Sequence, residues 1–110
     1  MRILHAGNFN NLRKAELFYC TDKKISLGLC RLGHFVYEYS CRDVARYLSP
    51  IKSKKFGVSR MNKHFIQTIE HLEPDLLLFG HSELIAEGTL IYIKKYYPEV
   101  KIGMWYVDPL

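Results

Sequence analysis

The stretch from Glu73 to His81, with the sequence EPDLLLFGH, constrains the fold of this chain more than any other. Pro74 disfavours a helical residue before it, and the apolar run from Leu76 to Phe79 has no polar interruption. Such a run is typical of a strand buried on both faces, as in a parallel sheet that helices cover on both sides. Because ligands bind at the carboxyl ends of strands in open α/β sheets, Gly80 and His81 mark the edge where function is expected.

Three more strands and several helices are predicted around this run, in alternation with it. The other strands are expected at 2–7, 34–39 and 100–107, and the helices at 21–32, 41–48, 59–72 and 86–97. The first strand-helix-strand unit requires a parallel, right-handed crossover. We therefore predict a Rossmann-like three-layer α/β domain. Its parallel four-stranded sheet has the order 2-1-3-4, because the first and third strands are the most continuously apolar and belong inside.

Apolar spacing predicts which helix faces point inward. The expected inward positions are Ile25, Leu29 and Leu32 in the first helix, Met61, Phe65, Ile69 and Leu72 in the third, and Leu90, Ile93 and Tyr97 in the last. Gly33 is expected to end the first helix and Ser59 to cap the third. His64 and His71 fall outside the apolar stripe, so we expect them to be solvated. Residues 49–59, with Pro50 and Gly57, are expected to form a mobile basic loop.

The chain of 110 residues is long enough for one small domain. It has no window apolar enough for a membrane span, and the run Met1 to Leu4 is too short for a signal peptide, so a cytoplasmic protein is expected. Its three cysteines lack C-x-x-C spacing, which favours reduced thiols and no metal site. Gly7 is followed by Asn8 and Phe9, so the dinucleotide motif G-x-G-x-x-G is absent and no cofactor is expected.

The formal net charge of +5 raises the question of nucleic-acid binding. Basic residues gather at Lys52, Lys54, Lys55, Arg60 and Lys63. Aromatic residues do not alternate with them as in most nucleic-acid modules, so nucleic acid is not expected as a partner. A solvated surface explains the cluster, and an acidic sugar, a phosphorylated acceptor or an anionic membrane suits it equally.

Three segments resemble a known family. They are a first strand ending in Gly7-Asn8, the phrase from Leu29 through Leu32-Gly33-His34 to Val36, and Pro74-Asp75-Leu76-Leu77-Leu78 followed later by Trp105-Tyr106-Val107-Asp108-Pro109. Together they resemble the N-terminal domain of GT-B glycosyltransferases, and most of all the spore-maturation (CgeB-like) proteins of the glycosyltransferase 4-like group. The resemblance covers nearly all of the chain.

The resemblance implies that residues 1–110 are an incomplete, acceptor-side N-terminal domain. Its nucleotide-sugar donor would bind a C-terminal domain absent from this chain, and a glycan or small molecule would be the acceptor. The candidate acceptor-binding residues are Gly7, Asn8, Phe9, His81, Glu83, Trp105 and Asp108. No catalytic residue can be assigned, because in this family the groups that grip the donor belong to the missing half.

Each candidate residue also has a purely structural interpretation. Gly7, Asn8 and Phe9 suit an ordinary turn after a strand, His81 and Glu83 suit an exposed loop before a helix, and Trp105 suits packing against a helix. The chain is also consistent with a free-standing Rossmann-like module that binds a small anionic ligand or a protein. An edge strand bearing Met104 and Trp105 predicts self-association, so a homo-oligomer is an expected partner state.

Overall fold

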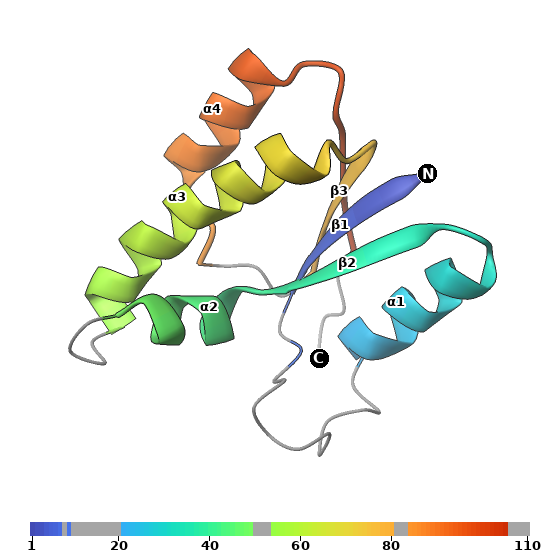
Figure 1. The fold of residues 1–110 in the computed structure, drawn as a ribbon, viewed down its shortest axis with the longest axis horizontal. Coiled ribbons are helices and arrows are strands. Elements are labelled where there is room, and N and C mark those ends of the chain that lie inside the picture. Colours follow the sequence, from blue (N-terminus) through green and yellow to red (C-terminus); the bar gives the residue numbers. More distant parts are fainter. Residues whose placement is uncertain (8, 10–20, 50–53, 81–83, 106–110) are drawn as a thin grey trace.

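The computed structural model describes residues 1–7, 9, 21–49, 54–80 and 84–105, with the backbone alone at 54–56. The strands in these ranges are β1 (Arg2–Gly7), β2 (Phe35–Ser40), β3 (Leu76–Phe79) and β4 (Lys101–Met104). All neighbouring strands are parallel, and their order is β2-β1-β3-β4 (Figure 1). This confirms the predicted Rossmann-like α/β sheet and its order.

Helices lie on both faces of this sheet. Their bounds are α1 (Thr21–Arg31), α2 (Cys41–Leu48), α3 (Lys54–Leu72) and α4 (Glu87–Tyr96). Helix α1 covers one face, whereas α3 and α4 lie on the opposite face and α2 packs beside the start of α3 (Figure 1). Within the described ranges, no helix has both the length and the apolar character needed to cross a bilayer.

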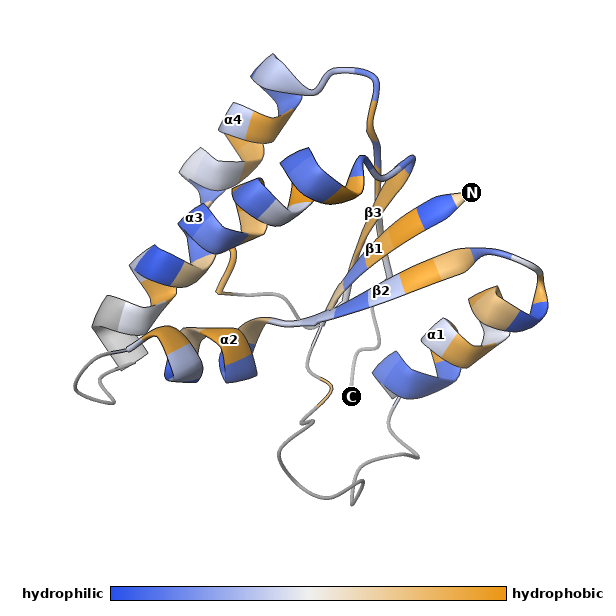
Figure 2. Cartoon of the chain, in the orientation of Figure 1, coloured by the Kyte–Doolittle hydropathy of each residue, from blue (hydrophilic) through white to orange (hydrophobic). Residues whose placement is uncertain are grey.

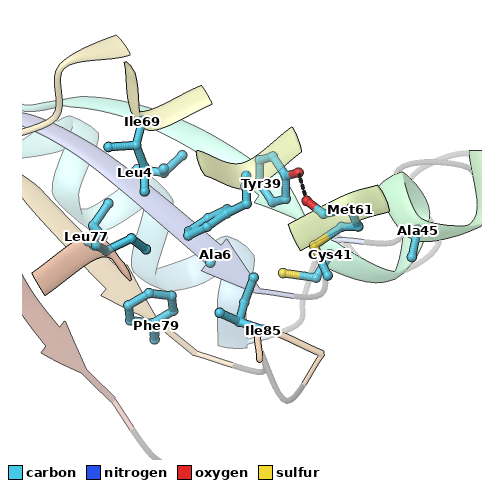
Figure 3. Packing of buried hydrophobic residues seen from close by; sticks show 12 residues of the cluster. Leu4, Ala6, Tyr39, Cys41, Ala45, Met61, Ile69, Leu77, Phe79 and Ile85 are labelled. Carbon is cyan, nitrogen blue, oxygen red and sulfur yellow. Dashed lines mark hydrogen bonds between the residues drawn. The ribbon is translucent and has the colours of Figure 1, made fainter. Parts of the chain in front are cut away.

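The main core lies between the sheet and α3, and Figure 3 shows its packing. Alternate strand residues point to this face, so Leu4 of β1 and Leu77 of β3, which are paired in the sheet, both reach it. The ring of Phe65 meets Tyr39 at a centroid distance of 4.9 Å and Phe79 at 5.9 Å. Met61, Phe65 and Ile69 are fully buried, which confirms the predicted stripe on α3. Figure 2 shows β3 in hydrophobic colours and an alternation of hydrophobic and hydrophilic residues along α3.

Helix α3 begins before the predicted cap, and this corrects two expectations. It starts at Lys54, so the expected loop over 49–59 is helical from that point, and Ser59 lies exposed inside the helix. Gly57 explains the difference. A Cβ atom there would overlap the backbone carbonyl oxygen of Ala45 in α2, so the glycine allows the two helices to touch. Residues 50–53 of that expected loop lie outside the described residues.

Helix α1 follows the predicted inward face only in part. Ile25 and Leu29 are half-buried, but Leu32 is 75% exposed, and the fully buried residues of α1 are Asp22 and Ser26. The prediction was wrong for Leu32, and it missed Ser26 because the opposing sheet face offers a histidine as well as apolar side chains. Gly33, in the turn that follows the last helical residue Arg31, has a φ of 89°, which confirms the predicted stop at a position that favours glycine.

His64 is not simply solvated, as its place outside the apolar stripe suggested. Its Nδ1 atom lies 2.7 Å from the hydroxyl oxygen of the buried Tyr39, which also lies 3.3 Å from the carbonyl oxygen of Met61. Burial raises the pKa of the Tyr39 hydroxyl, so the phenol stays protonated and donates. The prediction failed because a histidine beside a helix stripe reaches the hydroxyl of a long side chain on β2.

Asn62 holds α3 to the segment that leads into α4. Its Nδ2 atom donates to the carbonyl oxygens of Val58 at 2.9 Å and Leu84 at 3.0 Å. Its Oδ1 atom accepts from the backbone N–H of Ala86 and from the Thr89 hydroxyl, each at 2.8 Å. One largely buried amide therefore satisfies one polar group within α3 and three at the start of α4.

Candidate functional site

Three of the seven predicted site residues lie at the carboxyl edge of the sheet. Gly7 ends β1, Phe9 follows it, and Trp105 comes directly after β4. Asn8, His81, Glu83 and Asp108 lie outside the described residues. The carboxyl-edge cluster, as we call it, consists of His5, Gly7, Phe9, Asp22, Ser26 and Trp105. It combines two strand ends with the first turns of α1.

His5 is the centre of this cluster, although the sequence did not single it out. Its side chain is 0% exposed, on the face of β1 that α1 covers. Its Nε2 atom lies 2.9 Å from Nε1 of Trp105, and its Nδ1 atom lies 2.7 Å from Oγ of Ser26. An indole N–H can only donate, so Nε2 accepts and the proton of the neutral ring is assigned to Nδ1, which donates to Ser26. His5 thereby joins β1 to α1 and to the end of β4.

The environment of His5 favours its neutral form. Burial lowers the pKa of His5, because an imidazolium would lose its hydration, and the carboxylates of Asp22 and Glu38 oppose this lowering more weakly. A charged ring would also direct an N–H from Nε2 at the N–H of Trp105. With both nitrogens engaged and no exposure, His5 is not placed to act as a base on an external ligand. It is a positioning residue for Trp105.

Phe9 packs against His5 in the buried part of the cluster. It is buried, and its ring meets His5 edge-on at a centroid distance of 5.1 Å. Its backbone N–H donates to Oγ of Ser40 at 3.2 Å, which fixes the turn after β1 against the end of β2. Lys23 places its ammonium 5.3 Å from the centre of the Phe9 ring while it pairs with Glu38 at 2.8 Å. The predicted contact of Phe9 with an acceptor is therefore limited by its burial.

Glu38 and the nearby Asp43 have protein partners of their own. Glu38 accepts from Lys23, and Asp43 accepts a hydrogen bond of 2.7 Å from the Ser40 hydroxyl. These contacts hold the end of β2 and the start of α2 in place. In this structure both carboxylates thus serve the scaffold around the cluster.

Gly7 permits a close approach, and Asp22 is the group that approaches it. A Cβ atom at position 7 would overlap the carboxylate of Asp22, which is buried in the first turn of α1. A negative charge there is favourable because the N-terminus of a helix carries partial positive charge. In dinucleotide-binding domains, the turn between the first strand and helix offers this place to a phosphate. Here a carboxylate already occupies it.

Trp105 lies across the ends of three strands. Its backbone N–H donates to the carbonyl oxygen of Phe79 at 3.0 Å, which continues the pairing of β4 with β3. A Cβ atom at Gly80 would overlap the indole ring of Trp105, so the glycine allows this ring to pack directly on the backbone at the end of β3. The indole also reaches β1 through its hydrogen bond to His5. The indole of Trp105 therefore both packs on Gly80 and donates a hydrogen bond to His5, and the residue remains partly exposed.

Three residues of the cluster were missed or misjudged from the sequence. His5 carries a recognisable signal, since it is the only polar residue between Ile3 and Gly7 and a buried polar side chain needs a partner. Ser26 carries none, because a serine in a helix is usually exposed. Asp22 carries no signal beyond its place at the start of the first predicted helix, because its closeness to Gly7 depends on how α1 packs against β1.

The described residues contain no group of three or more His, Cys, Asp or Glu side chains that could hold a metal ion. Cys30 and Cys41 are free thiols. The fold and the cluster define a Rossmann-like α/β domain with a structured carboxyl edge. Comparisons with protein-family models, with curated proteins and with solved structures find no match to this chain.

Proposed function

We propose that this chain is the acceptor-side part of a GT-B glycosyltransferase. The complete enzyme would transfer a sugar from a nucleotide-sugar to a hydroxyl of a glycan or other acceptor, with release of the nucleotide. The donor would be held by a second domain that this chain does not contain. The acceptor would bind at the carboxyl-edge cluster, where β1, β3 and β4 end side by side.

The placement of Asp22 is the observation that carries this proposal. A buried carboxylate against Gly7 fills the position where a wound α/β domain would bind phosphate, so this edge suits a neutral, hydroxyl-bearing ligand better than an anion. The partly exposed indole of Trp105 supports the same choice, because an aromatic ring offers an apolar surface to the face of a sugar. Both features disfavour the alternative of a binding module for a small anionic ligand.

Binding of neutral sugars distinguishes the two interpretations. Trp105 is the only tryptophan, so its emission reports on ligands at the cluster. The protein is titrated with a panel of neutral oligosaccharides, with the matching sugar phosphates and with inorganic phosphate. We expect a saturable response to a neutral saccharide and none to inorganic phosphate. A response to phosphate that is stronger than the response to every neutral sugar would contradict the proposal.

A matched pair of variants locates the binding. Asp22→Asn removes the charge and keeps the size, so it is expected to increase phosphate binding at the N-terminus of α1. Lys94→Gln, an exposed change on α4, is the control and is expected to leave all titrations unchanged. If both variants behave alike, the cluster is not the site of binding.

The donor chemistry is tested by turnover. Stabilising the departing nucleoside diphosphate requires groups positioned from the second domain, so the 110-residue protein alone is expected to release no nucleotide from a panel of nucleotide-sugars. A protein extended to the natural end of the gene is the comparison. Equal turnover by the two proteins would show that this chain has an active site of its own.

A further inference from the structure

The outer edge of β4 is an open hydrogen-bonding surface among the described residues. The N–H of Lys101 donates to Asp75 at 3.1 Å and that of Trp105 donates to Phe79 at 3.0 Å, so these residues face β3. Backbone groups alternate in direction along a strand, and those of Ile102 and Met104 therefore point away from the sheet. In the described part of the chain, β3 is the only strand that pairs with β4.

Apolar side chains accompany these open backbone groups. Ile102 is 37% exposed and Met104 is 73% exposed, both on the sheet face that α3 covers elsewhere. On the opposite face, Gly103 presents no side chain. Edge strands are normally protected by charge, proline or a bulge, and the only charged residue of β4 is Lys101 at its start. The edge thus has the composition of an interior strand.

We propose that a second copy of this chain pairs with β4 in antiparallel fashion about a two-fold axis at Gly103. This register places Ile102 opposite Met104 of the other copy. The backbone N–H of each of these residues donates to the backbone carbonyl oxygen of the other. The same pairs occur twice because the axis relates them. The two sheets then form one continuous sheet across the interface.

Self-complementarity favours a second copy over a different strand. The register forms apolar Ile–Met pairs on one face and sets the two glycines, which have no side chains, against each other on the other face. Each Lys101 lies opposite Trp105 of the other copy, so the two lysines lie at opposite ends of the pairing. Among the paired residues 101–105, no like charges lie opposite each other, although the net charge of each chain is +5.

The dimer is expected to be weak and concentration-dependent. β4 has only four residues, and a strand of this length buries less than the ~800 Å² per partner that is typical of a stable interface. Sedimentation velocity of the 110-residue protein over a dilution series up to millimolar concentration measures it directly. We expect a reversible monomer–dimer equilibrium. A monomer at every concentration would overturn the proposal and leave the edge to a strand of another polypeptide.

Two variants that each replace an exposed apolar side chain with lysine test whether the dimer forms through β4. Met104→Lys adds a charge to the edge, the device that natural edge strands use against pairing, and is expected to weaken the dimer at least about tenfold. Ile91→Lys adds the same charge on α4, at a side chain that is 60% exposed, and is expected to leave the dimer unchanged. Circular dichroism checks that both variants are folded. Equal effects of the two substitutions would refute the assignment to β4.

A cysteine at the axis tests the register. Directly opposed residues in a non-hydrogen-bonded antiparallel pair have Cα atoms about 4.5 Å apart, which suits a disulfide. Gly103→Cys is tolerable because its Cβ would lie 3.6 Å from the nearest atom, on Leu78. In a background with Cys20→Ser and Cys30→Ser, oxidation is expected to give a covalent dimer. Ile91→Cys is the control, and no excess of dimer over it would overturn the proposed register.

Discussion

Lowering the pH below 6.5 is expected to destabilise this fold through His5. In the unfolded chain its imidazole binds a proton with a pKa near 6.5, whereas burial lowers the pKa of the folded state. Between these two values the unfolded chain binds more protons, so the free energy of unfolding falls as the pH falls. The contribution of neutral His5 to the free energy of unfolding is complete above pH 6.5. As the pH falls from 6.5 to the pKa of the folded state, this contribution decreases by up to about 1.4 kcal/mol per pH unit.

The geometry gives this loss a structural cause. A proton on Nε2 of His5 would meet the N–H of Trp105, now 2.9 Å away, so the hydrogen bond between β1 and the end of β4 would be broken. Asp22 and Glu38 are the carboxylates whose charge favours the proton, and Lys23 offsets Glu38 by pairing with it. Once the pH is below the folded pKa, both states carry the proton and the loss stops growing.

Urea unfolding at a series of pH values measures this effect, with the emission of Trp105 as the signal. His5→Gln retains an acceptor and a donor at this position but does not titrate, so the stability of this variant is expected to fall less steeply as the pH is lowered below about 6.5. His71→Gln removes an exposed histidine and is expected to keep the slope of the original protein. Equal slopes for the original protein and His5→Gln would refute the reasoning.

Further predictions concern stability and are checked by urea midpoints. Gly57→Ala is expected to cost about 2 kcal/mol, because its Cβ would overlap a carbonyl oxygen of α2, whereas Gly28→Ala, with open space around an exposed helix position, is expected to stabilise by about 0.5–1 kcal/mol. The opposite order of these two alanine variants would contradict the packing of α2 on α3. Asn62→Ala is expected to cost about 3 kcal/mol, since it leaves polar groups at the start of α4 without their partner; a loss below about 1 kcal/mol would mean that water replaces the amide. Gly33→Ala is expected to cost about 1 kcal/mol because of its φ of 89°, and a neutral result would show that the turn can relax.

The sheet could be predicted because its strands carry their own signals. The uninterrupted apolar run at 76–79 and the mostly apolar stretch at 2–7 identify the two inner strands, and the alternation with helices then determines parallel pairing. The start of α3 could not be predicted in this way. Gly57 has the local preference of a loop residue, and its helical conformation depends on contact with Ala45 of α2. Tertiary packing overrides local preference at that position.

The location of the candidate site could be predicted from the sequence, but the contacts of its residues could not. Topology brings Gly7, Phe9 and Trp105 to one edge, because parallel strands end on the same side of a sheet. Their surroundings depend on contacts that no local pattern encodes. Asp22 reaches Gly7 only after α1 has packed onto the sheet, and His5 finds its partner 100 residues away.

The central position of β1 affects how the chain folds during synthesis. β1 lies between β2 and β3, and Ile3 pairs with both Val36 and Leu76. A ribosome that adds ~5–20 residues per second makes β3 roughly 4–15 s after β1. During that time β1 and β2 present an incomplete sheet whose apolar inner edge has no partner. Closing this long loop is expected to limit the folding rate, and nascent chains are expected to be most vulnerable to aggregation just before Leu76 to Phe79 leave the ribosome.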